Sequence, residues 1–256
     1  MFTKQDQGRL LECLLDMGQL LLDAGAEISR TEDTLTRIGR AYGAKRLEVF
    51  VITSIISISI EFPGCHAITE TRRIHSTGQT DFYRVDKLNS LSRRCCAQPL
   101  PLDELEQGLE AVAKGRKPFS VVLGGSVLAA GSFAIFFGGT FLDGICASVF
   151  AAAVCYLQEY LGRTKLNMVA FNLLVSLLIG LGVGLVTWLV PALHMDKIII
   201  GVIMLLIPGL AMTNAIRNML VGDTISGVVR LAESLIWAAA LAGGFMVALS
   251  LVNALH

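Results

Sequence analysis

The chain has 256 residues, of which 54% are hydrophobic and 16% charged, and its mean hydropathy is +0.63. Its formal net charge at pH 7 is zero, so we expect no nucleic-acid partner. The six cysteines and four histidines show no metal-ligand spacing. We therefore expect reduced thiols, no metal site and no other cofactor.

Charged residues are concentrated in the first half of the chain. Residues 1–118 hold 32 of the 42 Asp, Glu, Lys and Arg residues, and residues 119–256 hold the other 10. This asymmetry predicts a soluble α/β domain over 1–116 followed by a membrane domain over 117–256. The polar, helix-patterned N-terminus predicts that the chain carries no cleavable signal peptide.

The soluble domain is predicted to begin with two helices. Leucines at helical spacing indicate a helix over about 10–22 that ends near Gly25. The segment Ser29-Arg30-Thr31-Glu32 matches a capping box, in which serine and glutamate each satisfy a free amide. A second helix is therefore expected to start there and to stop at Gly43.

A short, mainly antiparallel sheet is predicted next. Apolar and polar residues alternate strictly over 56–62, and we expect further strands over 47–53 and, after a Pro63-Gly64 turn, over 66–75. Helices are expected over 82–96 and 102–114. The serines at 54, 57 and 59 fit the polar face of a strand better than a hydrolytic nucleophile, since no Gly-x-Ser-x-Gly motif is present.

Five hydrophobic stretches follow, at about 119–139, 141–161, 166–190, 197–217 and 224–252. Each is close to the ~20 residues that a membrane-spanning helix needs. The sequence thus predicts an α-helical membrane protein with five transmembrane helices, preceded by a small cytoplasmic α/β domain. The many glycines in these stretches favour close helix packing.

Basic residues predict the orientation in the membrane. They gather before the first span, between the second and third, and between the fourth and fifth, and they are Lys114, Arg116, Lys117, Arg163, Lys165 and Arg217. The positive-inside rule therefore places the N-terminal domain in the cytoplasm and the C-terminus outside. We expect the chain to be a multi-pass protein of the cell inner membrane, surrounded by membrane lipid.

A Pro-Gly break in the fourth hydrophobic stretch indicates a functional site. Pro208 lies ~16 Å into the fourth stretch and Glu233 ~15 Å into the fifth, counted from opposite sides at 1.5 Å per residue. Broken helices with ionisable neighbours at mid-membrane depth are typical of transporter substrate sites. The predicted substrate-binding residues are Pro208, Gly209, Thr213, Asn214, Arg217, Asn218, Asp223, Arg230 and Glu233.

Each of these residues taken alone has a simpler structural interpretation. The Pro-Gly pair also fits a packing kink, and Arg230 and Glu233 also fit a structural ion pair on one helix face. Asp223 also fits a helix cap and Arg217 a positive-inside anchor. The clustering of all of them around one break favours a site, in which Arg230 binds a carboxylate and Glu233 balances it in the empty state.

Two regions resemble the threonine/serine exporter family. They are Leu22–Glu32 with Gly39 and Tyr42-Gly43, and then Pro208-Gly209, Asn214-Ala215, Arg217, Gly222-Asp223 and Gly227. Full-length members carry about twice as many spans. The resemblance therefore implies the larger subunit of the split, two-component type, which works with a second, smaller membrane subunit and is linked to succinate. The family usually has aspartate where this chain has Asn218, and an amide cannot titrate.

The functional prediction is a subunit of a secondary exporter for small carboxylate-bearing metabolites, either threonine and serine or a dicarboxylate such as succinate. No Gly-x-x-x-x-Gly-Lys-[Ser/Thr] motif for ATP is present, which favours secondary transport over an enzyme or a pump. We expect a complex with the second subunit, and a homo-oligomer is also compatible. The alternatives are a membrane-anchored sensor whose cytoplasmic domain binds a ligand, and a membrane-bound hydrolase.

Overall fold

The computed structural model describes residues 3–74, 80–115, 117–161 and 167–254. The chain divides into two compact units. The first combines Met1–Arg116 with Leu210–Leu231, and the second combines Lys117–Gly209 with Ala232–His256. The first unit therefore contains a segment of 22 residues that the predicted division near residue 116 assigns to the membrane domain.

Two helices open the first unit. Helix α1 (Lys4–Asp23) starts with a capping box between Thr3 and Asp6, and α2 (Ile28–Ala41) follows after a short connection. The predicted capping box at Ser29–Glu32 is wrong, because Glu27 is the N-cap residue of α2 and makes no side-chain cap bond. The carboxylate of Glu32 instead accepts a hydrogen bond from the backbone N–H of Val51 at 2.8 Å.

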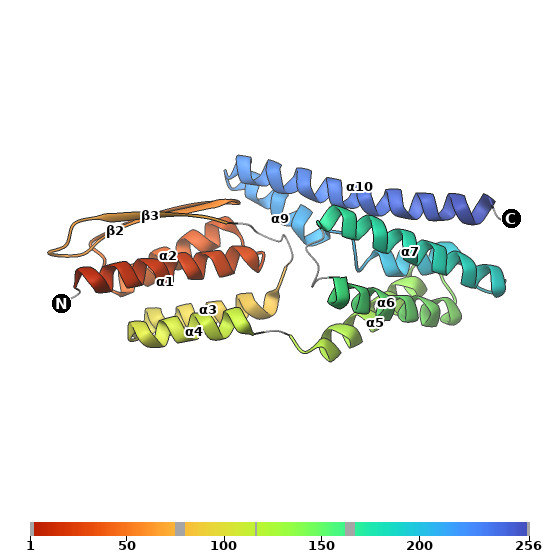
Figure 1. Ribbon diagram of the computed structural model, residues 1–256, viewed down its shortest axis with the longest axis horizontal. Coiled ribbons are helices and arrows are strands. Elements are labelled where there is room, and N and C mark those ends of the chain that lie inside the picture. The colour runs from red at the N-terminus through yellow and green to blue at the C-terminus, as the bar shows by residue number, and fades with distance from the viewer. Residues whose placement is uncertain (1–2, 75–79, 116, 162–166, 255–256) are drawn as a thin grey trace. The chain divides into compact units, whose positions relative to one another are not determined.

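The sheet has three antiparallel strands in the order β1 (Arg46–Ile52), β2 (Ile55–Glu61) and β3 (Ile68–Arg73). The isoleucines 56, 58 and 60 of β2 are fully buried and face α1, along which the sheet runs (Figure 1). On the other face Ser57 bonds Thr71 at 3.0 Å and Ser59 bonds Thr69 at 2.9 Å. These serines form the polar face of a strand, as predicted. His75, predicted to end the third strand, lies outside the described residues.

Helices α3 (Phe82–Ala97) and α4 (Leu102–Lys114) complete the N-terminal part of the first unit and match the predicted ranges closely. Leu88 of α3 and Leu105 of α4 are buried in the core that α1, α2 and the sheet also form. The hydroxyl of Tyr42 donates to the carbonyl of Leu100 at 2.8 Å and ties the end of α2 to the α3–α4 connection.

Long apolar helices build the second unit. They are α5 (Phe119–Phe136), α6 (Phe141–Leu161), α7 (Met168–Leu189) and, from residue 232 onward, α10 (Thr224–Ala254). Within the described residues, these four helices are long and apolar enough to cross a membrane. Helices α7 and α10 approach each other closely at Gly180, since a Cβ there would lie 2.6 Å from Cβ of Ala248. Arg116, Arg163 and Lys165, used to predict the orientation, lie outside the described residues.

The fourth predicted span, residues 197–217, is not one helix. The structure has α8 (Met195–Ile203) and α9 (Gly209–Leu220), each too short to cross a bilayer alone, so the described residues contain four continuous candidate spans rather than the predicted five. Pro208 stands directly before α9, as expected for a residue that cannot continue a helix. The predicted break is real, but it separates α8 in the second unit from α9 in the first.

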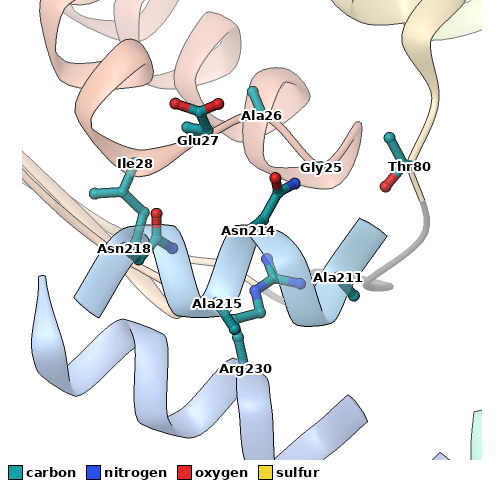
Figure 2. Close-up of a pocket in the computed structure, with 10 residues that line it drawn as sticks. All are labelled: Gly25, Ala26, Glu27, Ile28, Thr80, Ala211, Asn214, Ala215, Asn218 and Arg230. Carbon is teal, nitrogen blue, oxygen red and sulfur yellow. The ribbon is translucent and has the colours of Figure 1, made fainter. Parts of the chain in front are cut away.

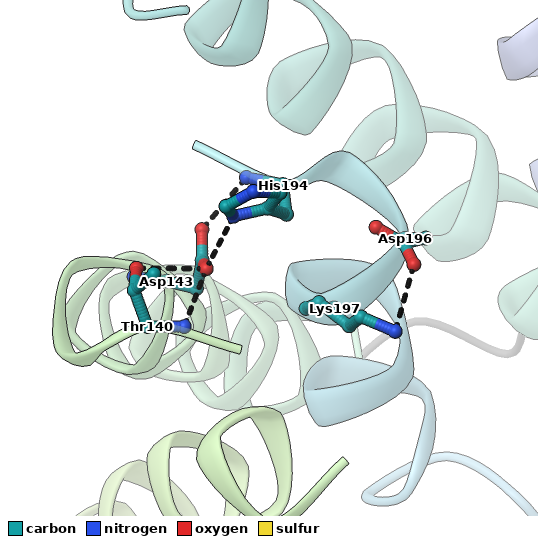
Figure 3. Close-up of polar contacts among 5 residues, drawn as sticks. All are labelled: Thr140, Asp143, His194, Asp196 and Lys197. Carbon is teal, nitrogen blue, oxygen red and sulfur yellow. Dashed lines mark hydrogen bonds and ion pairs between the residues drawn. The ribbon is translucent and has the colours of Figure 1, made fainter. Parts of the chain in front are cut away.

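A buried carboxylate holds the connection between α7 and α8 (Figure 3). The side chain of Asp143 is 0% exposed and accepts from the backbone N–H and hydroxyl of Thr140 at 2.7 and 2.8 Å. It also accepts from the backbone N–H of His194 at 2.7 Å, and the Nδ1 of His194 lies 2.9 Å from it. This contact fixes the start of α8 against the start of α6.

Candidate functional site

A pocket lies in the first unit, between the α1–α2 connection, the helix α9 and the first turns of α10 (Figure 2). It encloses about 420 Å³ of empty space, part of it open to solvent. The lining residues are Gly25, Ala26, Glu27, Ile28, Thr80, Ala211, Asn214, Ala215, Asn218 and Arg230.

The α1–α2 connection is shaped by the end of α1. Gly25 has a φ of 77°, a backbone conformation that residues with a Cβ seldom adopt. Its N–H donates to the carbonyl of Leu22 at 3.0 Å, and the N–H of Ala26 donates to that of Leu21 at 2.9 Å. This pair of bonds is a Schellman motif, which stops α1 and turns the chain sharply. Glu27 is thereby placed at the pocket, at the start of α2.

Helix α9 supplies the opposite wall. Asn214 and Asn218 are four residues apart and therefore lie on one helix face, and Ala211 and Ala215 share that face. In Figure 2 the side chains of Asn214 and Arg230 point toward the α1–α2 connection. Two amides and a guanidinium thus face a backbone turn, an arrangement rich in hydrogen-bond donors.

Arg230 reaches the pocket because α10 packs very closely on α9. A Cβ on Gly227 would lie 2.7 Å from the carbonyl oxygen of Ala215 and 3.0 Å from the backbone nitrogen of Met219. Only glycine permits that approach. The turn between the helices is held by the N–H of Asp223, which donates to the carbonyl of Asn218 at 2.9 Å.

The charges around the pocket are of both signs. The Nη1 of Arg217 on α9 lies 2.7 Å from Oε1 of Glu27, and this ion pair joins two segments 190 residues apart in sequence. The side chain of Glu27 is 16% exposed and that of Arg217 is 57% exposed. Burial raises the pKa of Asp23 beside the pocket, although Arg84 and Arg230 favour its ionised form. Burial also raises the pKa of Glu32 on α2.

The structure brings together only some of the predicted site residues. Asn214, Asn218 and Arg230 line the pocket, and Arg217 forms the ion pair at its edge. Two others stand elsewhere in the first unit: Thr213 is exposed on α9, and Asp223 is in the α9–α10 turn. Pro208, Gly209 and the exposed Glu233 belong to the second unit.

Sequence reasoning missed the other wall of the pocket. Gly25, Ala26, Glu27 and Ile28 lie within the first signature segment, yet no functional role was predicted for them. The Gly-Ala-Glu sequence just after a helix end was the available signal, because it combines a forced turn with a carboxylate. No sequence motif marked Thr80 as a residue that lines the pocket.

Two other kinds of site find little support in the structure. In the described part of the chain, no group of three or more His, Cys, Asp or Glu side chains is placed to hold a metal ion. The two strand serines at 57 and 59 bond threonines, as polar residues on one face of a sheet do.

Within the described residues, four apolar helices of membrane-spanning length indicate a multi-pass membrane protein. A family profile described as "Putative threonine/serine exporter" matches residues 12–252, and the chain belongs to this family. The resemblance predicted from the two signature segments is thereby confirmed at the level of the family.

Two relatives extend the comparison. The chain is 20% identical over 248 residues to the "Probable threonine/serine exporter" of Mycobacterium tuberculosis, covering 94% of this chain and 46% of the relative. It is 22% identical over 253 residues to the "Threonine/serine exporter" of Corynebacterium glutamicum, covering 94% of this chain and 50% of the relative. The chain therefore spans about half the length of these relatives. No solved structure matches it.

Proposed function

We propose that this chain is one half of a secondary exporter for threonine, serine or a closely related small amino acid. The observation that carries the proposal is the pocket at which the two signature segments meet, with a guanidinium, two amides and a carboxylate around it. The family and the names of the two relatives support an amino-acid exporter.

The pocket matches the chemistry of a zwitterion. Arg230 offers a planar donor pair that suits a carboxylate, and Glu27 offers a counter-charge for an ammonium group. Asn214 and Asn218 can donate to and accept from a side-chain hydroxyl. Because Glu27 is engaged by Arg217 in the empty pocket, ammonium binding requires that this ion pair be loosened. Substrate binding is thereby linked to a contact between α2 and α9.

A dicarboxylate such as succinate is the second candidate substrate. Arg217 is a second guanidinium at the edge of the pocket, and together with Arg230 it can pair with two carboxylates. The acidic groups nearby oppose this, because Glu27 and Asp23 repel a second negative charge. We therefore favour the amino acid.

We also propose that the chain works with a second subunit. In this proposal the chain is the larger subunit of a split exporter, and a smaller membrane protein is its partner. Homo-oligomers of the complex are compatible with this. We place it in the inner membrane, with the N-terminal domain and the pocket on the cytoplasmic side.

The test is counterflow in vesicles that contain this chain and its smaller partner, with labelled threonine and labelled succinate in parallel. Arg230→Lys keeps the charge but removes the planar donor pair, and it should impair counterflow at normal membrane expression. Arg37→Lys is the matched control, because Arg37 pairs with Asp33 on the exposed face of α2. Equal transport by wild type and Arg230→Lys contradicts the assignment of Arg230.

The same measurement separates an exporter from a membrane-anchored sensor. A sensor binds its ligand in the pocket but does not exchange it across the vesicle membrane. Threonine binding to the purified protein without counterflow in the complete complex therefore refutes the exporter and supports the sensor.

A further inference from the structure

Asp23, the last residue of α1, carries a buried carboxylate oxygen beside the pocket. It lies two residues before Gly25, which lines the pocket. Among the residues that the structure describes, its Oδ1 has no hydrogen-bond partner. A buried ionised oxygen without a donor is costly, whereas the protonated form supplies its own O–H. Burial accordingly raises the pKa of Asp23 above its ordinary value.

The charged groups around Asp23 come from several elements. Arg84 on α3 and Arg230 on α10 both favour its ionised form, and Gln19 on α1 contributes a hydrogen bond. Arg84 also pairs with Asp81, and the distance from Nε of Arg84 to the carboxylate of Asp81 is 3.8 Å. That Nε is buried and forms no hydrogen bond within the described residues. Two guanidinium groups thus favour the ionised form of Asp23, while its buried Oδ1 has no hydrogen-bond donor among the described residues.

Arg230 is the group that connects Asp23 with the pocket. It lines the pocket and at the same time stabilises the ionised carboxylate of Asp23. A ligand carboxylate that binds Arg230 screens this charge, so the ionised form of Asp23 loses part of its stabilisation. Its affinity for a proton then rises, and by reciprocity a proton on Asp23 leaves Arg230 more available to the ligand.

We propose that Asp23 is the proton-exchanging residue of this protein, which takes up a proton from solvent when a carboxylate ligand occupies Arg230 and releases it when the ligand leaves. This inference rests on the proposed function, because it needs a carboxylate-bearing ligand in the pocket. No bond other than the O–H bond of Asp23 is made or broken.

Other acidic groups near the pocket are less suited to this role. Glu27 already forms an ion pair with Arg217 at 2.7 Å. Glu32 accepts the N–H of Val51, and its other charged neighbour is Asp223 rather than Arg230. Asn218 lines the pocket but is an amide and does not titrate.

The experiment is calorimetry of threonine binding to the purified chain, at several pH values and in buffers that differ in ionisation enthalpy. Comparison of the buffers gives the number of protons taken up per ligand bound. Wild type should take up protons and bind more tightly as the pH falls, by up to about tenfold per pH unit. Asp23→Asn should bind threonine without proton uptake and with a flat pH profile.

Asp33→Asn is the matched control, because Asp33 is an exposed acid on α2 that pairs with Arg37. It should keep the proton uptake of wild type. Binding of threonine to wild type without proton uptake overturns the role of Asp23 and leaves the proposed function intact. If neither threonine, serine nor succinate binds wild type, the proposed function fails and this inference fails with it.

A second measurement needs no ligand and guards against misfolding of the Asp23→Asn variant. Infrared titration of the empty protein should show a protonated carboxylic acid that persists above the ordinary aspartate range. In Arg230→Gln this band should persist to still higher pH, because a stabilising cation has been removed. An unchanged titration in Arg230→Gln overturns the link between the two residues.

Discussion

Helices α9 and α10 cross closely at Gly227, so the sign of the stability change caused by Gly227→Ala tests how they pack. In an exposed helix, Gly→Ala stabilises by about 1 kcal/mol, because alanine loses less backbone entropy on folding. At Gly227 the new methyl group would lie 2.7 Å from the oxygen of Ala215 and 3.0 Å from the nitrogen of Met219. Carbon atoms normally approach other heavy atoms no closer than about 3.5 Å. The two helices must therefore separate by roughly 0.5–1 Å.

The cost of this separation exceeds the gain in helix propensity. Both atoms belong to the backbone of α9, so no side-chain rotation relieves the contact. Overpacking of this kind costs about 1–3 kcal/mol. We expect Gly227→Ala to lower the free energy of unfolding by up to about 2 kcal/mol after the propensity gain is subtracted. Arg230, one turn further along α10, would move away from the α1–α2 connection, so threonine binding should weaken as well.

The assay is the unfolding midpoint of the purified protein in detergent, together with threonine binding. Gly8→Ala is the matched control, because Gly8 is a helical glycine of α1 in the same unit and a Cβ there meets no atom within 4 Å. The control should be as stable as wild type or more so. If Gly227→Ala is also neutral or stabilising, the close packing of α9 on α10 is refuted.

Three further predictions concern other contacts. In a double-mutant cycle, the stability effects of Glu27→Gln and Arg217→Met should be coupled by about 0.5–1 kcal/mol. The coupling energy is small because Arg217 is half exposed to solvent. Additive effects of the two substitutions would contradict the ion pair. Asp143→Asn should lower the unfolding midpoint more than His194→Ala. The buried carboxylate of Asp143 accepts hydrogen bonds from both Thr140 and His194, whereas the imidazole of His194 is exposed. A larger effect of His194→Ala would contradict this reasoning. In a cysteine-free background, a membrane-impermeant thiol reagent added from outside should label a cysteine at position 194 and not one at 45, and the opposite pattern would reverse the orientation.

The elements that sequence predicted well are those set by local pattern. Strict alternation around Ile58 identified β2 and its buried face, because a strand places successive side chains on opposite faces. The long helices α5, α6, α7 and α10 followed from apolar length alone. Gly25 and Gly43 marked helix ends, and both have positive φ.

The elements that sequence did not predict depend on distant contacts. Hydropathy averaged over 197–217 suggested one span, but Pro208 divides it and α9 packs with the first unit. The start of α2 was predicted two residues late, because the turn at Gly25 and Ala26 sets that start rather than a serine cap.

The wall of the pocket opposite α9 was missed for the same reason. Both signature segments were visible in the sequence, but Glu27 and Arg217 are 190 residues apart. Periodicity and composition contain no information on which distant segments meet. The candidate list therefore included Glu233 and Pro208, which are close in sequence to the lining residues Arg230 and Ala211 but do not line the pocket themselves.

The central claim is that threonine or serine binds in the pocket between α9 and the α1–α2 connection. Protection of a cysteine at Asn214 tests it most directly, with Thr213→Cys as control, because residue 213 is the neighbouring exposed position of α9 that does not line the pocket. In a cysteine-free background, threonine should slow the reaction of Asn214→Cys with a thiol reagent and leave Thr213→Cys unaffected. If threonine, serine and succinate protect neither position, or protect both equally, the pocket is not the substrate site.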